Sequence, residues 1–163
     1  METEPAAGTE NVPESTLSQE ARRLVAAGRR GVLSALIPRD GYPYGSLVEY
    51  APLPDGDVLL FFSRLAEHQH YISADPRVSL LVAADFSSAD ALASPRVSLV
   101  GKMMLLPKEE ELAATDLAAH PQARPYINFG DFQFYRLQVE KARYIAGFGR
   151  MGWITAGRYR QAV

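Results

Sequence analysis

The stretch FQFYRLQVEKARYIAGF, residues 132–148, decides the fold class of this chain. Apolar and polar side chains alternate along it, which is the period of a β-strand with one buried face. The apolar positions are Tyr135, Leu137 and Val139 and then, one residue out of step, Tyr144, Ala146 and Phe148. A β-bulge near Lys141 and Ala142 would explain the shift and would bend the strand, as closure of a barrel requires. The stretch therefore predicts one long, bent strand.

Shorter apolar-rich segments lie before this strand, and turn sequences separate several of them. The segments are residues 31–37, 46–53, 57–63, 78–84 and 96–106. The sequences PRDG at 38–41 and PDG at 54–56 are typical of tight turns, because proline presets φ and glycine tolerates positive φ. About six strands at hairpin spacing predict a mainly β protein, either a barrel or a sandwich.

Three segments have helical patterns. Ser15 or Thr16 can cap a first helix that ends at Gly28. Residues 65–74 predict a short second helix. It is expected to end there because the residue before Pro76 avoids the helical region. A third is expected to begin at Pro107, with three glutamates in its first turn, and to end before Pro121. Residues 85–95, rich in small and polar side chains, are expected to form a loop.

Composition limits the possible classes of protein. A chain of 163 residues without an internal repeat has the length of one domain, and its net charge of -2 offers no basic surface to nucleic acid. No apolar run approaches the roughly 20 residues of a membrane-spanning helix. The absence of cysteine excludes disulfides and Cys-based metal sites. Residues 1–14 lack the apolar core of a signal peptide, so we expect a disordered tail, a domain at 15–163 and a cytoplasmic protein.

The junction FFSRLAEHQ, residues 61–69, is the strongest local candidate for a binding site. Ser63 can cap a helix there, which leaves unpaired backbone N–H groups on the following residues. Arg64 and His68 are four residues apart and share one helix face. Such a helix amino terminus can hold a phosphate. The alternative is an ordinary capped helix with two exposed polar side chains.

Several motifs in a fixed order resemble one known superfamily. The sequences GYPYGSLV at 41–48, FSRLAEH at 62–68 and ADPRVSLLV at 74–82 are similar to the pyridoxamine 5'-phosphate oxidase-like split barrels. PRVSLVG at 95–101, His120-Pro121, and the motifs at 126–132 and 147–153 resemble the branch that includes the HugZ-type haem oxygenases. The resemblance covers nearly all of residues 31–153.

This resemblance implies a six-stranded antiparallel split β-barrel of Greek-key topology, of the type that binds FMN. It also implies a homodimer with two equivalent clefts between the subunits. Carried over by position, Gly45, Ser46, Leu47 and Val48 would line the flavin ring, and Phe62 and Ser63 would touch the ribityl phosphate. His68 and Gln69 stand where the oxidases have an Arg-Lys pair for the phosphate. Arg150 and Trp153 would come from the other subunit.

The leading functional hypothesis is therefore an FMN-dependent oxidoreductase, in which Ser63, Arg64 and His68 secure the phosphate. Its substrate and catalytic residues are not predicted, and no metal site is expected.

Two alternatives remain. The same cleft could bind or degrade haem, and its iron ligand would then be His68, His70, His120, or water or hydroxide. In the haem-degrading relatives a histidine of a carboxy-terminal extension holds the iron, and no histidine follows His120 in this sequence. The other alternative is a split barrel without catalysis that only binds a partner.

Overall fold

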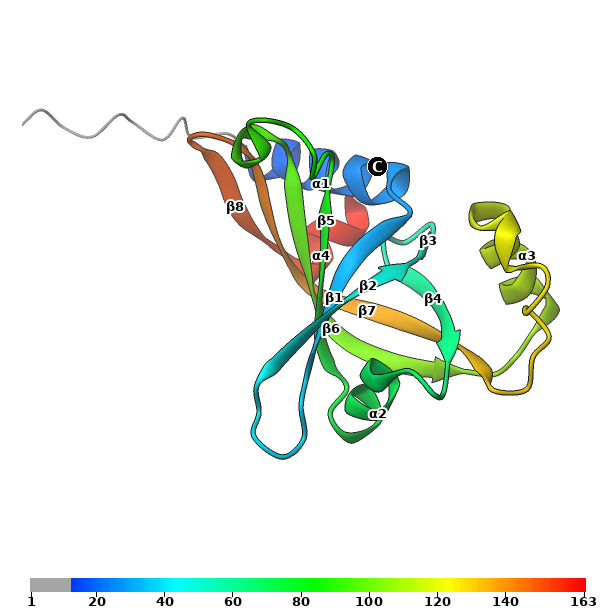
Figure 1. Ribbon diagram of the computed structural model, residues 1–163. Helices are drawn as coiled ribbons and strands as arrows, with labels where there is room; N and C mark the ends of the chain where they lie inside the picture. The colour runs from blue at the N-terminus through cyan, green and yellow to red at the C-terminus, as the bar shows by residue number, and fades with distance from the viewer. Residues whose placement is uncertain (1–12) are drawn as a thin grey trace, which may run out of the picture.

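A computed structural model describes residues 13–163, and within them the chain forms one eight-stranded antiparallel sheet with four α-helices (Figure 1). The strands are β1 (Arg30–Leu36), β2 (Pro43–Glu49), β3 (Ala51–Pro52), β4 (Val58–Ser63), β5 (Arg77–Ala83), β6 (Arg96–Leu106), β7 (Phe132–Gly147) and β8 (Arg150–Thr155). The helices are α1 (Glu14–Ala27), α2 (Glu67–Ala74), α3 (Glu110–Ala119) and α4 (Ala156–Gln161), with short 3-10 turns η1 (Ala91–Ala93) and η2 (Pro121–Ala123). The predicted mainly β class is confirmed.

The strands follow the order β2-β1-β5-β6-β7-β4-β3. The eighth strand, β8, pairs with the C-terminal half of β7, from Lys141 to Gly147. The sheet is strongly twisted and curled, and α2 lies beside the β1–β2 hairpin and β4 (Figure 1). Ser46 of β2 and His68 of α2 are in hydrogen-bonding contact there, so α2 bridges the gap that the curled sheet leaves between β2 and β4. This incomplete closure is the split that the family resemblance predicts.

The predicted bulge in β7 is present. The β6–β7 register slips between Val100 and Gly101, which leaves Glu140 without a residue opposite it. A Cβ atom at Gly101 would lie 1.9 Å from the carbonyl oxygen of Gln138, so only glycine permits this approach of the two strands. The bulge lies one residue before the predicted Lys141 and bends β7 so that β8 can cover one end of the core.

Two clusters of buried side chains hold the fold together. The larger fills the barrel, where Leu33, Leu80 and Leu99 are fully buried, and α1 covers it with Ala21 and Val25. The smaller cluster lies beneath α3 and consists of Ala51, Leu59, Ile127 and Phe134. The expected apolar face of the first helix is thus confirmed.

The structure corrects several predicted boundaries. The predicted strand at 46–53 breaks at Tyr50, because its N–H donates to the carbonyl of Arg29 and its hydroxyl to that of Val25. Together with β8, which the sequence did not reveal, the two-residue β3 raises the strand count above six. The third helix begins at Glu110 instead of Pro107.

The predicted tail at 1–14 falls almost wholly outside the described residues, and its last residue, Glu14, belongs to α1. No helix within residues 13–163 is long and apolar enough to cross a bilayer.

Candidate functional site

The corner where α2 meets β2 and β4 contains four of the site residues that the sequence predicted. Ser46, Phe62, His68 and Gln69 meet Tyr135 of β7 there, and we call these five residues the α2 corner. Alternation along β2 turns Ser46 and Val48 towards the interior and leaves Gly45 and Leu47 exposed. The four neighbouring residues predicted to line one ligand therefore face two different sides of the sheet.

His68 points into the α2 corner rather than towards solvent. Its Nδ1 lies 3.2 Å from Ser46 Oγ, and its ring meets the ring of Phe62 edge-on at 4.5 Å. Its Nε2 is buried and has no hydrogen-bond partner among the described residues. Burial lowers the pKa of His68 below its ordinary value of 6.5. His68 is therefore a neutral side chain at neutral pH and supplies no positive charge.

Gln69 is also committed to its own chain. Its Nε2 donates to the hydroxyl of Tyr135 at 3.0 Å and to Ser73 Oγ at 2.9 Å. The Tyr135 hydroxyl donates in turn to Gln133 Oε1 at 3.1 Å, while the Tyr135 ring stacks on Phe62 at 4.6 Å. The two donor hydrogens of the Gln69 amide are used within the protein.

The prediction that Ser63 caps α2 is wrong, because the N-cap position is Ala66, which has no capping side chain. Ser63 Oγ instead donates to Asp131 Oδ2 at 2.7 Å and accepts from the N–H of Leu65 at 3.0 Å. The N–H of Arg64 donates to the backbone carbonyl of Asp131 at 2.7 Å. The Ser63 hydroxyl, which was expected to bind phosphate, is therefore already bonded to the carboxylate of Asp131.

These contacts test whether the residues present fit the phosphate of FMN. A phosphate carries close to two negative charges, and a carboxylate beside it is repulsive. His68 is neutral and turned inward, the Ser63 hydroxyl binds Asp131, and only Arg64 is an exposed cation. As they stand, these residues do not fit an FMN phosphate.

The outer face of the sheet contains two more of the predicted site residues, Leu47 and Trp153. One row of directly paired residues crosses six strands, and its members alternate with fully buried residues such as Leu33 and Leu80, so the row faces away from the core. We call it the outer row: Leu47, Val32, Leu81, Ser98, Arg143 and Trp153. Leu47 and Trp153, which the family resemblance assigns to opposite subunits, are its two ends.

Arg150 and Trp153 both lie on β8, away from the α2 corner along the sheet. Arg150 Nη2 pairs with Glu20 Oε1 of α1 at 2.7 Å. Trp153 is 53% exposed and lies beside Lys141 and Arg143. Within one chain the structure therefore brings neither residue to the α2 corner.

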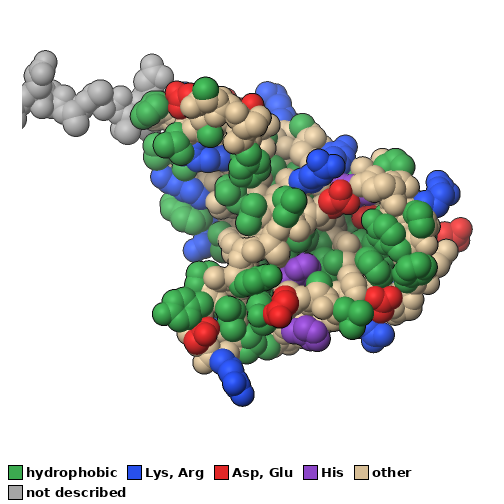
Figure 2. Space-filling model, in the orientation of Figure 1, with side chains coloured by type: hydrophobic (Ala, Val, Ile, Leu, Met, Phe, Trp, Pro, Cys, Tyr) green, Lys and Arg blue, Asp and Glu red, His purple; other side chains and the backbone are tan. Residues whose placement is uncertain are grey.

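The three histidines have different environments. His120 is buried, and its Nε2 lies 2.7 Å from the carbonyl oxygen of Tyr50. His70, on α2, is exposed, and Figure 2 shows histidine side chains reaching the surface on this face of the molecule. No group of three or more acidic or histidine side chains in residues 13–163 is arranged to hold a metal ion.

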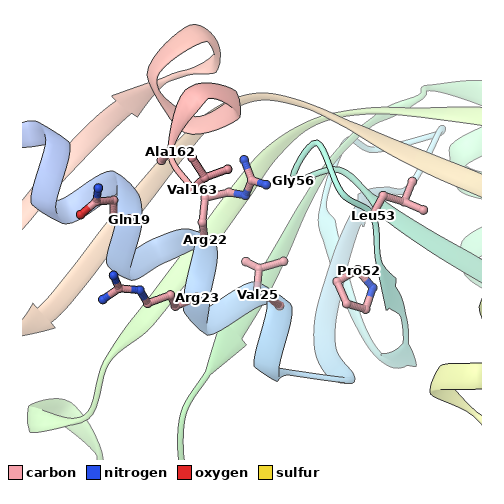
Figure 3. A pocket seen from close by; sticks show the side chains of 10 residues that line it. Gln19, Arg22, Arg23, Val25, Pro52, Leu53, Gly56, Ala162 and Val163 are labelled. Carbon is pink, nitrogen blue, oxygen red and sulfur yellow. The ribbon is translucent and has the colours of Figure 1, made fainter.

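A pocket of about 180 Å³ lies far from all these residues, between α1, the β3–β4 turn and α4 (Figure 3). Arg22 lines it, but its guanidinium donates to the carbonyls of Pro54, Tyr159 and Arg160. These bonds tie the end of α4 to the turn, so Arg22 has a structural role. None of the nominated residues lines this pocket.

Sequence reasoning missed two residues of the site, Asp131 and Tyr135. Asp131 lies inside the matched motif at 126–132, but its polarity alone does not show that it binds Ser63, 68 residues away in the chain. Tyr135 was identified only as an apolar position of a strand. Tyr135 lies two residues from Gln133 on the same face of the strand, and its hydroxyl bonds to the Gln133 side chain. This spacing was the clue in the sequence to a polar group that points inward.

Comparison with known proteins establishes the family. A family model described as CREG, beta-barrel, matches residues 13–161. The chain belongs to this family. The pyridoxamine 5'-phosphate oxidase-like split-barrel resemblance is confirmed, as is the haem-protein branch within it.

Two of the similar proteins are 35% and 36% identical to the chain. The chloroplastic heme oxygenase HOZ of Arabidopsis thaliana is 35% identical over 132 residues, which are 79% of this chain and 40% of HOZ. The structure of a heme binding protein from Mycobacterium smegmatis is 36% identical, with a TM-score of 0.80 over 90% of this chain and 60% of that one. The chain thus spans less than two thirds of either relative. HutZ, the heme storage protein of Vibrio cholerae, is 16% identical with a TM-score of 0.66 over 85% of this chain and 94% of HutZ, and shows the fold alone.

Proposed function

We propose that this protein binds haem in a cleft between two copies of itself, and that haem rather than FMN is its cofactor or substrate. The observation that carries the proposal is that the side chains expected to bind the FMN phosphate are already bonded to other residues of the chain. Ser63 is bound to Asp131, and His68 and Gln69 are bound to Ser46 and Tyr135. A haem needs no phosphate site, only a flat apolar surface with cations at its edge for two carboxylates.

The relatives support the same choice. The relatives that are 35% and 36% identical to this chain are named as haem proteins, one an oxygenase and one a binding protein. Because the chain spans only 40% and 60% of their lengths, haem degradation is a separate proposal from haem binding. The cytoplasmic location expected from the sequence stays a prediction.

The outer face supports a homodimer. Large apolar side chains are exposed on the hairpins and loops around it, and such surfaces in soluble proteins mark interaction sites. They are Tyr42 (68% exposed), Leu47 (74%), Phe86 (60%), Leu92 (69%), Phe148 (87%) and Met151 (43%). In a two-fold dimer the same patch faces itself, so Leu47 of one copy can meet Trp153 of the other. This arrangement would bring the two ends of the outer row together.

Haem, when bound, supplies an iron that can activate oxygen. Of the three histidines, His120 is buried and bonded to Tyr50, and His68 is turned into the α2 corner. His70 is exposed on α2. We therefore expect His68→Ala and His120→Ala to keep the Soret maximum of the haem complex, while His70→Ala is the variant that tests for a protein ligand.

Separate titrations with haemin and FMN test the proposal. We expect a Soret shift that saturates at one haemin per chain, and no stoichiometric FMN binding. Ser63→Ala and Arg64→Ala are the matched variants, because the FMN hypothesis requires both residues and the haem proposal requires neither. Tight FMN binding that either variant abolishes, without haemin binding, would overturn the proposal.

A second measurement separates a carrier from a degrading enzyme. The haem complex is mixed with a reductant in air, and the Soret absorbance is followed. Progressive loss with a product absorbing at longer wavelength would establish degradation. A stable Soret band would establish binding alone.

A further inference from the structure

The β7–β8 hairpin holds two cations against one indole ring. Lys141 Nζ lies 5.2 Å from the centre of the Trp153 ring, and the Arg143 guanidinium carbon lies 5.9 Å from it. Both distances are in the range of cation–π contacts. We call Lys141, Arg143 and Trp153 the cation cluster.

The bulge in β7 determines which way these side chains point. Beyond it, Ala142 and Tyr144 face the core and are buried, so Lys141 and Arg143 face outward. Trp153 is the residue directly opposite Arg143 on β8, and its neighbour Ile154 is buried. All three members of the cluster therefore lie on the outer face, at the β8 end of the outer row.

Neither cation has a carboxylate partner within residues 13–163. The nearby acidic side chains are used elsewhere, since Glu140 pairs with Lys102 at 3.7 Å and Glu20 pairs with Arg150 at 2.7 Å. Figure 2 shows Lys and Arg side chains interleaved with hydrophobic ones over β8. Two unneutralised charges beside exposed apolar surface are suited to a ligand that is both flat and anionic.

We propose that Lys141 and Arg143 bind the carboxylates of a planar tetrapyrrole, and that Trp153 is a positioning residue that holds the two cations at the sheet surface. The inference deepens the proposed function and rests on it. The indole ring keeps two long, flexible side chains together before the ligand arrives, so less side-chain entropy is lost on binding. In the dimer, this end of the outer row meets the exposed Leu47 of the other copy, which supplies apolar surface for the ring.

Porphyrins that differ only in their anionic groups or their metal test the inference. Haemin, iron-free protoporphyrin IX and haemin dimethyl ester are titrated into wild type and into the double variant Lys141→Ala/Arg143→Ala. The affinity for both free acids should fall at least about tenfold in the double variant, as expected when charge-assisted hydrogen bonds are lost. Affinity for the ester should be the same in both proteins.

The matched control is Lys102→Ala, which removes one positive charge from the neighbouring strand but a charge already paired with Glu140. It should leave all three affinities unchanged. Trp153→Phe should retain most of the affinity for protoporphyrin IX, because a ring remains, whereas Trp153→Leu should weaken it and increase its sensitivity to salt. Circular dichroism of each variant checks that the sheet is intact.

The outcomes distinguish this inference from the proposed function. If wild type binds no porphyrin, the proposed function fails and the inference with it. If wild type binds haemin and the double variant binds it equally well, the function stands and the inference is overturned. FMN is included as an anionic ring of the other class, and a loss confined to FMN in the double variant would assign the cluster to a flavin phosphate and also overturn the inference.

Discussion

The α2 corner and the outer face at β8 contain similar kinds of side chain, but they use them in opposite ways. In the α2 corner His68 bonds to Ser46 and Gln69 bonds to Tyr135, and next to the corner Ser63 bonds to Asp131, so these polar groups are all paired within their own chain. At β8, Lys141 and Arg143 have no carboxylate partner in the described part of the chain and lie against an exposed tryptophan. A sequence motif shows which residue types stand at which positions. The polar groups and charges that remain unpaired in the folded chain show where a ligand can bind.

The comparison also separates interior from surface electrostatics. His68 has lost its charge through burial, since its Nε2 is enclosed without a partner. The two cations at β8 lie instead on the outer face of the sheet, where Lys141 is exposed and Arg143 is half-buried. A region that resembles a phosphate site in sequence has therefore become a structural joint between α2 and the sheet.

Replacing Gly101 by alanine should have the largest effect, because it attacks the bulge that gives Lys141 and Arg143 their outward direction. The new Cβ would lie 1.9 Å from a backbone oxygen of Gln138 that cannot move independently of the strand. We expect a loss of about 3 kcal/mol or more in the free energy of unfolding, measured by urea denaturation. Gly130→Ala, whose Cβ would meet nothing within 4 Å, is the control and should change stability by less than about 0.5 kcal/mol.

Leu47→Glu should break the proposed dimer by placing a charge at one end of the outer row. We expect the dissociation constant of the dimer to rise by about a hundredfold, measured by light scattering over a dilution series. Leu65→Glu is the matched control, since Leu65 is even more exposed (81% against 74%) but lies in the β4–α2 connection, outside the outer row. Equal mass distributions for both variants would contradict the assignment of the outer face to the interface.

Tyr135→Phe should weaken the α2 corner moderately. The substitution keeps the ring that stacks on Phe62 and removes only the hydroxyl that links Gln69 to Gln133. A buried hydrogen bond of this kind contributes about 1 kcal/mol to stability, which thermal or urea unfolding resolves. Tyr71→Phe serves for comparison, because the hydroxyl of Tyr71 bonds to Glu67 on the exposed side of α2 and should matter less.

The pH dependence of His68 should give the smallest effect. Its pKa is lower in the folded protein than the ordinary 6.5 of an unfolded chain, so the unfolded state binds the proton more readily. Its contribution to stability is then complete above pH 6.5 and decreases as the pH falls from there through the folded pKa. His68→Leu should therefore flatten the stability profile between about pH 7.5 and 5.

Asp116 should act in the opposite direction over the same range. It belongs to α3 and its side chain is buried, and burial raises its pKa to about 6. Because protonation favours its folded form, its contribution to stability appears as the pH falls and is lost as the pH rises through about 6. The slope that belongs to His68 is best measured in an Asp116→Asn background, and an unchanged slope after His68→Leu in that background would show that the ring is not enclosed as described.

The amino-acid sequence by itself determined the class of the fold and much of its layout. Period-two patterns identified most of the strands, and the one-residue shift in residues 132–148 located the bulge to within one or two residues. Both are local consequences of which face of a strand is buried, so neighbouring residues suffice to detect them. The motifs also placed the chain correctly in its superfamily and in the haem-protein branch.

Only the tertiary structure decided what the nominated side chains do. Ser63 meets Asp131 across 68 residues of sequence, and Trp153 and Leu47 share one row only because six strands pair in one register. The strand β8 and the break at Tyr50 were not predicted for the same reason, because both depend on pairing with segments that are distant in the sequence. Strand periodicity is a property of a few adjacent residues, whereas the partner of a polar group is set by long-range packing, which no local pattern records.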